Sequence, residues 1–99
     1  MALRVAAEVE AELGEIWSYV ATKSGDAEIA DHLIDSIADC FFMLSKHPHL
    51  GRHRDYDLRP GLRSMTVAEY VLIYRIEGSD VLILHVIHGR RDLKTLLHQ

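Results

Sequence analysis

The sequence predicts one α+β domain spanning residues 1–99, with the element order β-α-α-β-β-β and an antiparallel sheet covered on one face by an antiparallel helical hairpin. Helical hydrophobic periodicity fills most of the first half, and three runs rich in β-branched and aromatic residues fill most of the second. Glycine or proline stands at the main changes of pattern. A sheet and a hairpin that each have an apolar face bury those faces by packing together.

The helical hairpin is predicted to span about residues 7–46, after a short, weak strand over residues 2–6. Gly25 suits the left-handed position after the first helix and Asp26 suits the N-cap of the second, so the helices turn back on each other. Pro48 ends the second helix, because the residue before a proline is driven out of helical angles. Each helix has an apolar face at helical spacing, made of Val9, Leu13, Ile16, Trp17 and Val20 in the first and of Ala30, Leu33, Ile34, Ile37, Phe41 and Leu44 in the second.

The second half predicts a three-stranded meander over about residues 62–88, preceded by a polar loop over residues 47–61. Pro60 and Gly61, at the end of this loop, are typical of a type II turn. A hairpin turn is expected at Gly78, where a polar tetrapeptide separates two apolar runs. The strands themselves are expected over residues 62–67, 70–76 and 81–88.

The charges are divided unequally between the two halves of the chain. Residues 1–45 carry two Lys/Arg and nine Asp/Glu, a net charge of −7, whereas residues 46–99 carry nine Lys/Arg and six Asp/Glu, a net charge of +3. Because nucleic-acid binding depends on neutralising phosphates, the overall net charge of −4 argues against direct nucleic-acid binding. The basic half, which also holds six of the seven histidines, is suited to an acidic partner.

Cysteine content and hydropathy predict a cytoplasmic protein. Cys40 is the only cysteine, which excludes an internal disulfide and fits a reducing compartment. It lies in an apolar helical stretch, where a buried and inert thiol is expected. No apolar run approaches the ~20 residues that span a bilayer, and the first residues lack the apolar core of a signal peptide. Neither a membrane partner nor a cofactor is expected.

The loop histidines raise the question of a metal site. His47, His49 and His53 with Asp55 match no strong zinc spacing, and no cysteine lies near them, so a solvated loop without metal is expected.

Two aromatic residues of the first helix are assigned different roles. Trp17 belongs to the apolar face and is expected in the core, whereas the next aromatic residue, Tyr19, lies off that face and is a weak candidate for contact with a target protein.

Five segments, taken in order, resemble toxins of the RelE/ParE superfamily of type II toxin-antitoxin systems, and most closely the ParE branch. Together they cover nearly the whole chain, and the β-α-α-β-β-β fold of that family agrees with the order derived above. The first strand is shorter than is usual in the family. The segments are Glu12-Leu13-x-x-Ile16-Trp17-x-Tyr19-Val20-Ala21 with Ser24-Gly25, His47-Pro48-x-Leu50-Gly51-Arg52, Asp57-Leu58-Arg59-Pro60-Gly61-Leu62-Arg63-Ser64, Tyr70-Val71-Leu72-Ile73-Tyr74-Arg75 and Val86-Ile87-His88-Gly89-Arg90-Arg91-Asp92.

The resemblance implies a toxin that inhibits DNA gyrase by binding and that a ParD-like antitoxin neutralises. We expect the meander to bring its arginines together into one basic patch for an acidic antitoxin segment or for gyrase, since Arg pairs with carboxylates directionally. The alternative is a set of ordinary surface salt bridges with Asp55, Asp57 and Asp92. The residues expected to bind the antitoxin are Arg52, Arg59, Arg63, Arg75, His88, Arg90 and Arg91.

The RelE branch implies a different function, a ribosome-dependent mRNA endonuclease. Cleavage through the 2′-hydroxyl needs a general base, a general acid and a cation, roles that His88, Arg63 and Arg75 could fill. RelE-type enzymes, however, keep a catalytic Tyr or His-Tyr pair near the C-terminus, and no Tyr follows Tyr74 here. The sequence therefore favours inhibition by binding, with no catalytic residue expected. A family member without toxicity, serving as a structural or regulatory partner, is a third alternative.

Overall fold

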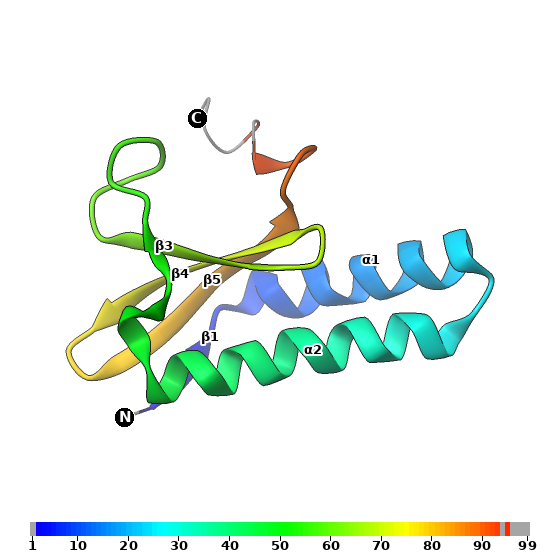
Figure 1. Cartoon of the computed structure of the whole chain (residues 1–99), viewed down its shortest axis with the longest axis horizontal. Coiled ribbons are helices and arrows are strands. Elements are labelled where there is room, and N and C mark those ends of the chain that lie inside the picture. The colour runs from blue at the N-terminus through cyan, green and yellow to red at the C-terminus, as the bar shows by residue number, and fades with distance from the viewer. Residues whose placement is uncertain (1, 94, 96–99) are drawn as a thin grey trace.

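The computed structural model describes residues 2–93 and 95, and the elements follow the predicted order with two additions, a 3₁₀ turn and a short strand (Figure 1). The helices and the three long strands begin and end within one residue of the predicted positions. The elements are β1 (Leu3–Val5), α1 (Ala7–Ser24), α2 (Ala27–Lys46), the 3₁₀ turn η1 (Pro48–Leu50), β2 (Arg52–His53), β3 (Leu62–Val67), β4 (Tyr70–Glu77) and β5 (Asp80–His88).

The five strands form one mixed sheet in the order β1-β5-β4-β3-β2. The predicted antiparallel pairing is confirmed for β3 to β5, and β2, which the sequence did not predict, also pairs antiparallel with β3. At the other edge β1 pairs with β5 in parallel, with Leu3 opposite Val81 and Val5 opposite Ile83. The chain passes through both helices and the meander before it returns beside β1, and a long connection of this kind permits parallel neighbours that a tight hairpin does not.

Strand β2 lies inside the segment that the sequence predicted as a loop. Arg52 pairs with Ser64 and His53 with Arg63, so β2 forms an edge of the sheet beside the start of β3. Two polar residues carry no alternating hydrophobic pattern, which is why this strand could not be predicted. Its pairing ties the backbone of the loop to the sheet, while both of its side chains stay exposed.

The predicted turns have the backbone geometry that their residues favour. Gly25 has φ 71° and its N–H donates to the carbonyl oxygen of Ala21, while the carboxylate of Asp26 accepts from the N–H of Glu28 at 2.9 Å. Gly61 has φ 85°, and the N–H of Leu62 donates to the carbonyl oxygen of Arg59 at 3.2 Å. These contacts confirm the helical hairpin and the turn into the meander.

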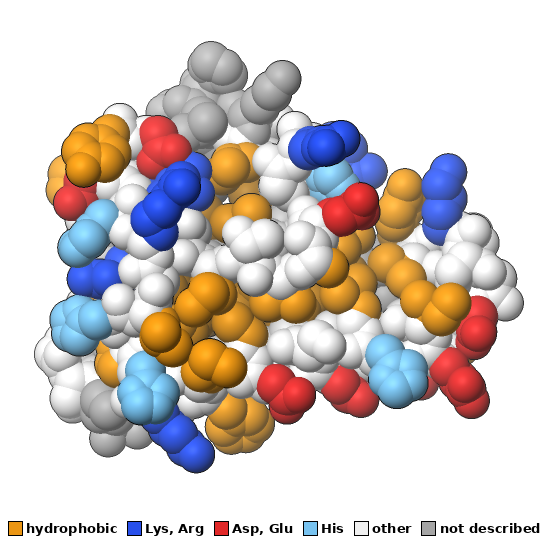
Figure 2. Space-filling view, in the orientation of Figure 1, with side chains coloured by type: hydrophobic (Ala, Val, Ile, Leu, Met, Phe, Trp, Pro, Cys, Tyr) orange, Lys and Arg blue, Asp and Glu red, His pale blue; other side chains and the backbone are white. Residues whose placement is uncertain are grey.

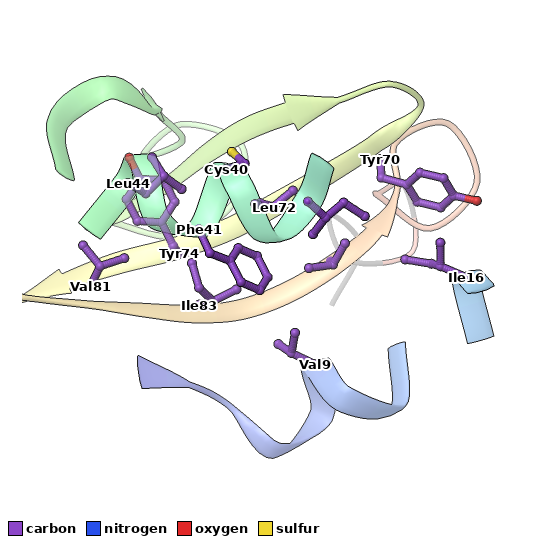
Figure 3. Packing of buried hydrophobic residues seen from close by; sticks show 12 residues of the cluster. Val9, Ile16, Cys40, Phe41, Leu44, Tyr70, Leu72, Tyr74, Val81 and Ile83 are labelled. Atoms are coloured by element: carbon purple, nitrogen blue, oxygen red, sulfur yellow. The ribbon is translucent and has the colours of Figure 1, made fainter. Parts of the chain in front are cut away.

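The helical hairpin covers one face of the sheet, and the core lies between them (Figure 1). Figure 3 shows the buried side chains from both helices and from β4 and β5 meeting in one cluster. Each fully buried Val, Leu, Ile or Phe in it contributes about 1.5–3 kcal/mol. The labelled members are Val9, Ile16, Cys40, Phe41, Leu44, Tyr70, Leu72, Tyr74, Val81 and Ile83.

Trp17 does not lie in this core, contrary to the prediction. Its side chain is 37% exposed, and its indole Nε1–H donates to the carboxylate of Asp31 at 2.8 Å, which links α1 to α2. The preceding residue, Ile16, takes the buried position on the sheet side. Successive helical residues differ by about 100° in direction, so Trp17 points past the sheet toward the outer side of α2.

Cys40 is buried, as predicted, and burial raises the pKa of its thiol, which keeps it protonated and inert.

Across residues 2–93 and 95, the helices are too short or too polar to cross a membrane.

Candidate functional site

The arginines do not form the single patch that the sequence predicted. Arg63 lies opposite Tyr74, whose side chain is in the helix-covered core, whereas Arg75 is the next residue along β4 and projects from the other face. Arg90 and Arg91 follow β5 at its far end, where His88 lies opposite Tyr70. Tyr70 and Arg75 are five positions apart, about 16 Å along an extended strand. Strand register and strand length therefore separate the arginines.

Arg75 and Arg91 make ordinary surface contacts. A guanidinium nitrogen of Arg75 lies 2.6 Å from a carboxylate oxygen of Glu77, with both side chains partly exposed. Arg91 lies 3.5 Å from the carboxylate of Asp92, and its guanidinium carbon is 5.4 Å from the centre of the Tyr19 ring. The alternative of surface salt bridges thus holds for these two residues, although Arg75 uses Glu77 as its partner.

Arg63 ties the loop after α2 to the sheet. One terminal nitrogen, Nη1, donates to the carbonyl oxygens of Gly51 at 2.8 Å and of His49 at 3.3 Å. The other, Nη2, lies 3.2 Å from Nδ1 of His49 and 3.1 Å from Nε2 of His53. The guanidinium therefore holds the backbone of η1 and the rings of two histidines at once.

Tyr74 holds the same loop from the side of the core. Its buried hydroxyl donates to the carbonyl oxygen of Pro48 at 2.7 Å and accepts from the N–H of Gly51 at 2.8 Å. Burial raises the pKa of this hydroxyl, so it stays protonated. A Cβ at Gly51 would lie 2.2 Å from the Tyr74 hydroxyl oxygen, so this close contact requires glycine.

Arg54 is a functional candidate that the sequence analysis missed. It is 6% exposed, and Nη1 donates to the hydroxyl of Ser64 at 3.0 Å while Nε donates to the carboxylate of Asp57 at 2.9 and 3.1 Å. This contact lowers the pKa of Asp57. A second carboxylate, that of Asp55, accepts from the N–H of Gly61 at 2.8 Å. The Arg-x-x-Asp spacing was the one available signal, but burial of the arginine is not visible in the sequence.

We call residues 54–61 the arch, because these contacts fix both of its ends. The arch carries Arg59 and presents Tyr56, which is 96% exposed. Beneath it lies an open pocket, the basic pocket, lined by His49, Gly51, Arg52, His53, Tyr56, Asp57 and Arg63. Figure 2 shows Lys, Arg and His side chains gathered over this loop side of the molecule, and Asp and Glu side chains along the outer side of the helices.

His88 closes the other end of the meander. Its ring packs edge-on against Tyr70 at 5.5 Å between centres, and its Nδ1 accepts long hydrogen bonds from the N–H groups of Arg90 at 3.3 Å and Arg91 at 3.2 Å. Its Nε2 lies 3.8 Å from the carboxylate of Glu69. The imidazole therefore stabilises the turn that follows β5.

Glu12 of α1 caps the part of β5 that extends beyond β1. Its carboxylate accepts from the N–H of Val86 at 2.9 Å and lies 2.9 Å from Nδ1 of His85. A small pocket at this junction is lined by Glu12, Val86, Tyr19 and Arg91 among others. Tyr19 is exposed, as predicted.

The three residues considered for RNA cleavage do not converge. His88 lies at the Tyr70 end of β4, whereas Arg63 lies opposite Tyr74, four positions or about 13 Å further along. Arg75 projects from the other face of the sheet. Within the described part of the chain, His, Cys, Asp and Glu also form no group of three or more that could hold a metal ion.

Comparison with known proteins matches residues 3–93 to the family described as ParE toxin of type II toxin-antitoxin system, parDE. Toxin ParE3 of Caulobacter vibrioides is 37% identical over 89 residues, which cover 90% of this chain and 87% of that protein. Toxin ParE1 of the same organism is 32% identical over 94 residues, 95% of each chain.

A solved structure, described as the chromosomal ParDE TA system from P. aeruginosa, superposes with a TM-score of 0.76 at 22% sequence identity, over 89% of this chain and 95% of that one. At this identity the likeness supports the fold alone, and it confirms the β-α-α-β-β-β arrangement. The family match and the two Caulobacter relatives carry more, and by them this chain belongs to the ParE toxin family of type II toxin-antitoxin systems.

Proposed function

We propose that this chain acts in the cytoplasm as a toxin that inhibits DNA gyrase by binding to it, and that a ParD-like antitoxin neutralises it. Membership of the ParE family supports the toxin role, and the described ParDE system of the structural neighbour supports an antitoxin partner. Gyrase as the target is carried over from the ParE resemblance.

The observation that favours binding over catalysis is the separation of the candidate catalytic residues. His88 is held by the turn after β5, Arg63 is committed to the loop backbone, and Arg75 lies on the other sheet face. A phosphoryl-transfer site needs its acid, base and cation within hydrogen-bonding reach of one phosphate. No described arrangement of these three residues meets that condition, so the mRNA endonuclease remains the less favoured alternative.

The proposed antitoxin contacts fall into two regions rather than one. Arg52 and Arg59 lie exposed on the loop side, with Arg63 fixed behind them in the basic pocket. At the other end lie His88, Arg90 and Arg91, and Arg75 stands apart on the open face of the sheet. We propose that the antitoxin wraps around the domain to reach both regions, as a segment that folds on binding can do. Tyr19, next to Arg91, remains a weak candidate for contact with the target.

The test is to induce the chain without its neighbouring gene and to follow DNA, RNA and protein synthesis over time. We expect DNA synthesis to stop first and a DNA-damage response to appear. If protein synthesis stops first and mRNA is cut within reading frames, the endonuclease is correct and gyrase inhibition is not. If growth continues although the chain accumulates in folded form, the non-toxic alternative is correct.

A further inference from the structure

The basic pocket has a donor arrangement that is set by Arg63. Its guanidinium can only donate hydrogen bonds, because Arg has no lone pair to offer. The Nη2 contacts at 3.2 and 3.1 Å therefore require unprotonated Nδ1 in His49 and unprotonated Nε2 in His53. In a neutral imidazole the proton then resides on the other nitrogen. Nε2 of His49 and Nδ1 of His53 thus both carry hydrogen on the sides of the rings that face away from Arg63.

Arg52 strengthens the preference of the pocket for an anion, and the two nearby carboxylates do not occupy its donors. Arg52 adds an exposed guanidinium to the lining. Asp57 is the carboxylate in the lining, and it is already held by the buried Arg54. The nearest carboxylate oxygen of Asp55 is 3.8 Å from Nδ1 of His53, beyond hydrogen-bonding distance. Among the described residues, no hydrogen bond uses either of these outward N–H groups, which leaves them open to an external oxygen acceptor.

An apolar contact lies beside these donors. Tyr56 is 96% exposed and stands on the arch, whose ends are fixed by the Arg54–Asp57 and Asp55–Gly61 contacts. Tyrosine presented on a fixed backbone gives contact area at a low entropic cost, which is why such residues anchor protein interfaces. Leu50, in the turn before the pocket, is also 50% exposed. The surface therefore matches a ligand that combines a carboxylate with apolar side chains.

We infer that the basic pocket binds a carboxylate side chain of an acidic, partly apolar protein segment, with His49, Arg52 and His53 as its donors and Tyr56 as its apolar anchor. Arg63 is a positioning residue that fixes both histidine tautomers. The inference deepens the proposed antitoxin contact on the loop side, and it rests on that proposal for the identity of the partner.

A protein segment fits this surface better than a nucleic acid. Nucleic-acid binding requires several cations along a line of phosphates. Here Arg52 is the exposed lining cation, each of the two histidines offers one outward N–H, and Arg63 is committed to protein acceptors. Residues 1–45, with a net charge of −7, would repel an extended polyanion. A short acidic segment needs only one pocket and an apolar neighbour.

The experiment uses the full chain with isotope-labelled histidines and records imidazole tautomers and backbone amides by NMR. Before any ligand is added, His49 should be the Nε2–H tautomer and His53 the Nδ1–H tautomer, and Arg63→Gln should shift both toward a mixture. Three probes are then titrated separately: a short capped peptide of Glu and Leu, its counterpart with Gln in place of Glu, and single-stranded oligothymidylate. The Glu peptide should shift the His49, Arg52 and His53 signals, and the Gln peptide should bind at least about tenfold more weakly.

Variants separate the contributions within the pocket. Arg52→Gln should weaken the Glu peptide about tenfold by removing a charge-assisted hydrogen bond, and Tyr56→Ala should weaken both peptides alike because it removes only apolar contact. Lys23→Gln makes the same change of charge at the end of α1 and should leave the affinity unchanged. Equal binding of the two peptides, shifts caused by oligothymidylate instead, or no shift with any probe would each overturn the inference. Because the test uses no gyrase and no cells, its failure would leave the gyrase proposal standing.

Discussion

The two ends of the meander are closed by polar contacts of different strength. On the loop side, Tyr74 is fully buried and Arg54 is 6% exposed, and each makes several short hydrogen bonds to the chain. On the α1 side, the side chains of Glu12, His85 and Arg91 are 20, 36 and 60% exposed. Buried polar contacts stabilise more than exposed ones and cost more when broken. The loop side is therefore a rigid platform, and the α1 side is a weaker closure.

The largest effect should come from Gly51→Val. The added side chain would meet the Tyr74 hydroxyl and break its hydrogen bonds to Pro48 and Gly51, so we expect a loss of about 3–5 kcal/mol in the free energy of unfolding. Urea unfolding followed by circular dichroism measures it. Gly14→Ala is the control, because it lies in open space on α1 and should stabilise the domain by about 1 kcal/mol. Equal effects of the two changes would contradict the rigid platform.

Arg54→Gln should be the next most damaging change. It removes the partner of Asp57 and leaves the buried hydroxyl of Ser64 without its donor, at a cost of about 2–3 kcal/mol. Arg75→Gln is matched in charge but breaks only an exposed pair with Glu77, so it should cost less than about 0.5 kcal/mol. Thermal unfolding of both variants measures the difference, and a cost for Arg75→Gln as large as that for Arg54→Gln would contradict the comparison.

On the α1 side, Glu12→Ala should cost about 1 kcal/mol. The change removes the acceptor for the N–H of Val86 and the partner of His85, but both contacts are only partly buried, so water that enters the space left by the carboxylate can replace it. Hydrogen exchange should show faster exchange confined to the amide of Val86 and its neighbours. Exchange that also accelerates in the arch would show that the two ends are not independent.

A smaller and opposite effect is expected at Ala68, in the turn between β3 and β4. Its φ of 54° is strained for a residue with a side chain. Ala68→Gly should relieve the strain and stabilise the domain by about 0.5–1 kcal/mol, whereas Ala38→Gly, in the middle of α2, should destabilise it by about 1 kcal/mol. Melting temperatures of the two variants should move in opposite directions.

The smallest effect is a pH dependence carried by Asp57. Its hydrogen bonds with Arg54 lower its pKa in the folded chain, so the pair stabilises the fold above the ordinary carboxyl pKa and loses this contribution as the pH falls through the lowered pKa. Stability should therefore decline in the acid range, and Asp57→Asn should decline less steeply. Since the Asp57 side chain is 38% exposed, solvent screens the pair and the difference should be modest. The free energy of unfolding is measured against pH for the unchanged chain and for Asp57→Asn. An equally steep decline in both would contradict this role.

The helices, the meander and their turns could be predicted because local signals agree there. Periodicity gave the two helices, and Gly25, Asp26 and Gly61 adopt the conformations that these residue types favour. Strand β2 could not be predicted, because Arg52 and His53 are both polar and are held by pairing with β3. Tertiary pairing of this kind leaves no local pattern.

The candidate site was less predictable than the fold. Whether Arg63 and Arg75 share a face depends on strand register, and a shift of one residue reverses the answer. Arg54 was overlooked because buried arginines are rare, and its burial here depends on Ser64 and Asp57. His49 and His53 were expected in a solvated loop, and both are exposed. Their contact with Arg63 could not be predicted, because it arises only when η1 and β2 fold against β3.

The central proposal, inhibition of gyrase by binding, is tested most directly by DNA supercoiling with purified components. Relaxed plasmid is incubated with gyrase, ATP and increasing amounts of this chain, with and without the product of the neighbouring gene. We expect supercoiling to fall in proportion to the amount of chain until inhibition saturates, and the neighbouring product to restore it. Undiminished supercoiling in the presence of excess folded chain would contradict the account, and cleavage of mRNA on ribosomes by the same preparation would replace it with the endonuclease.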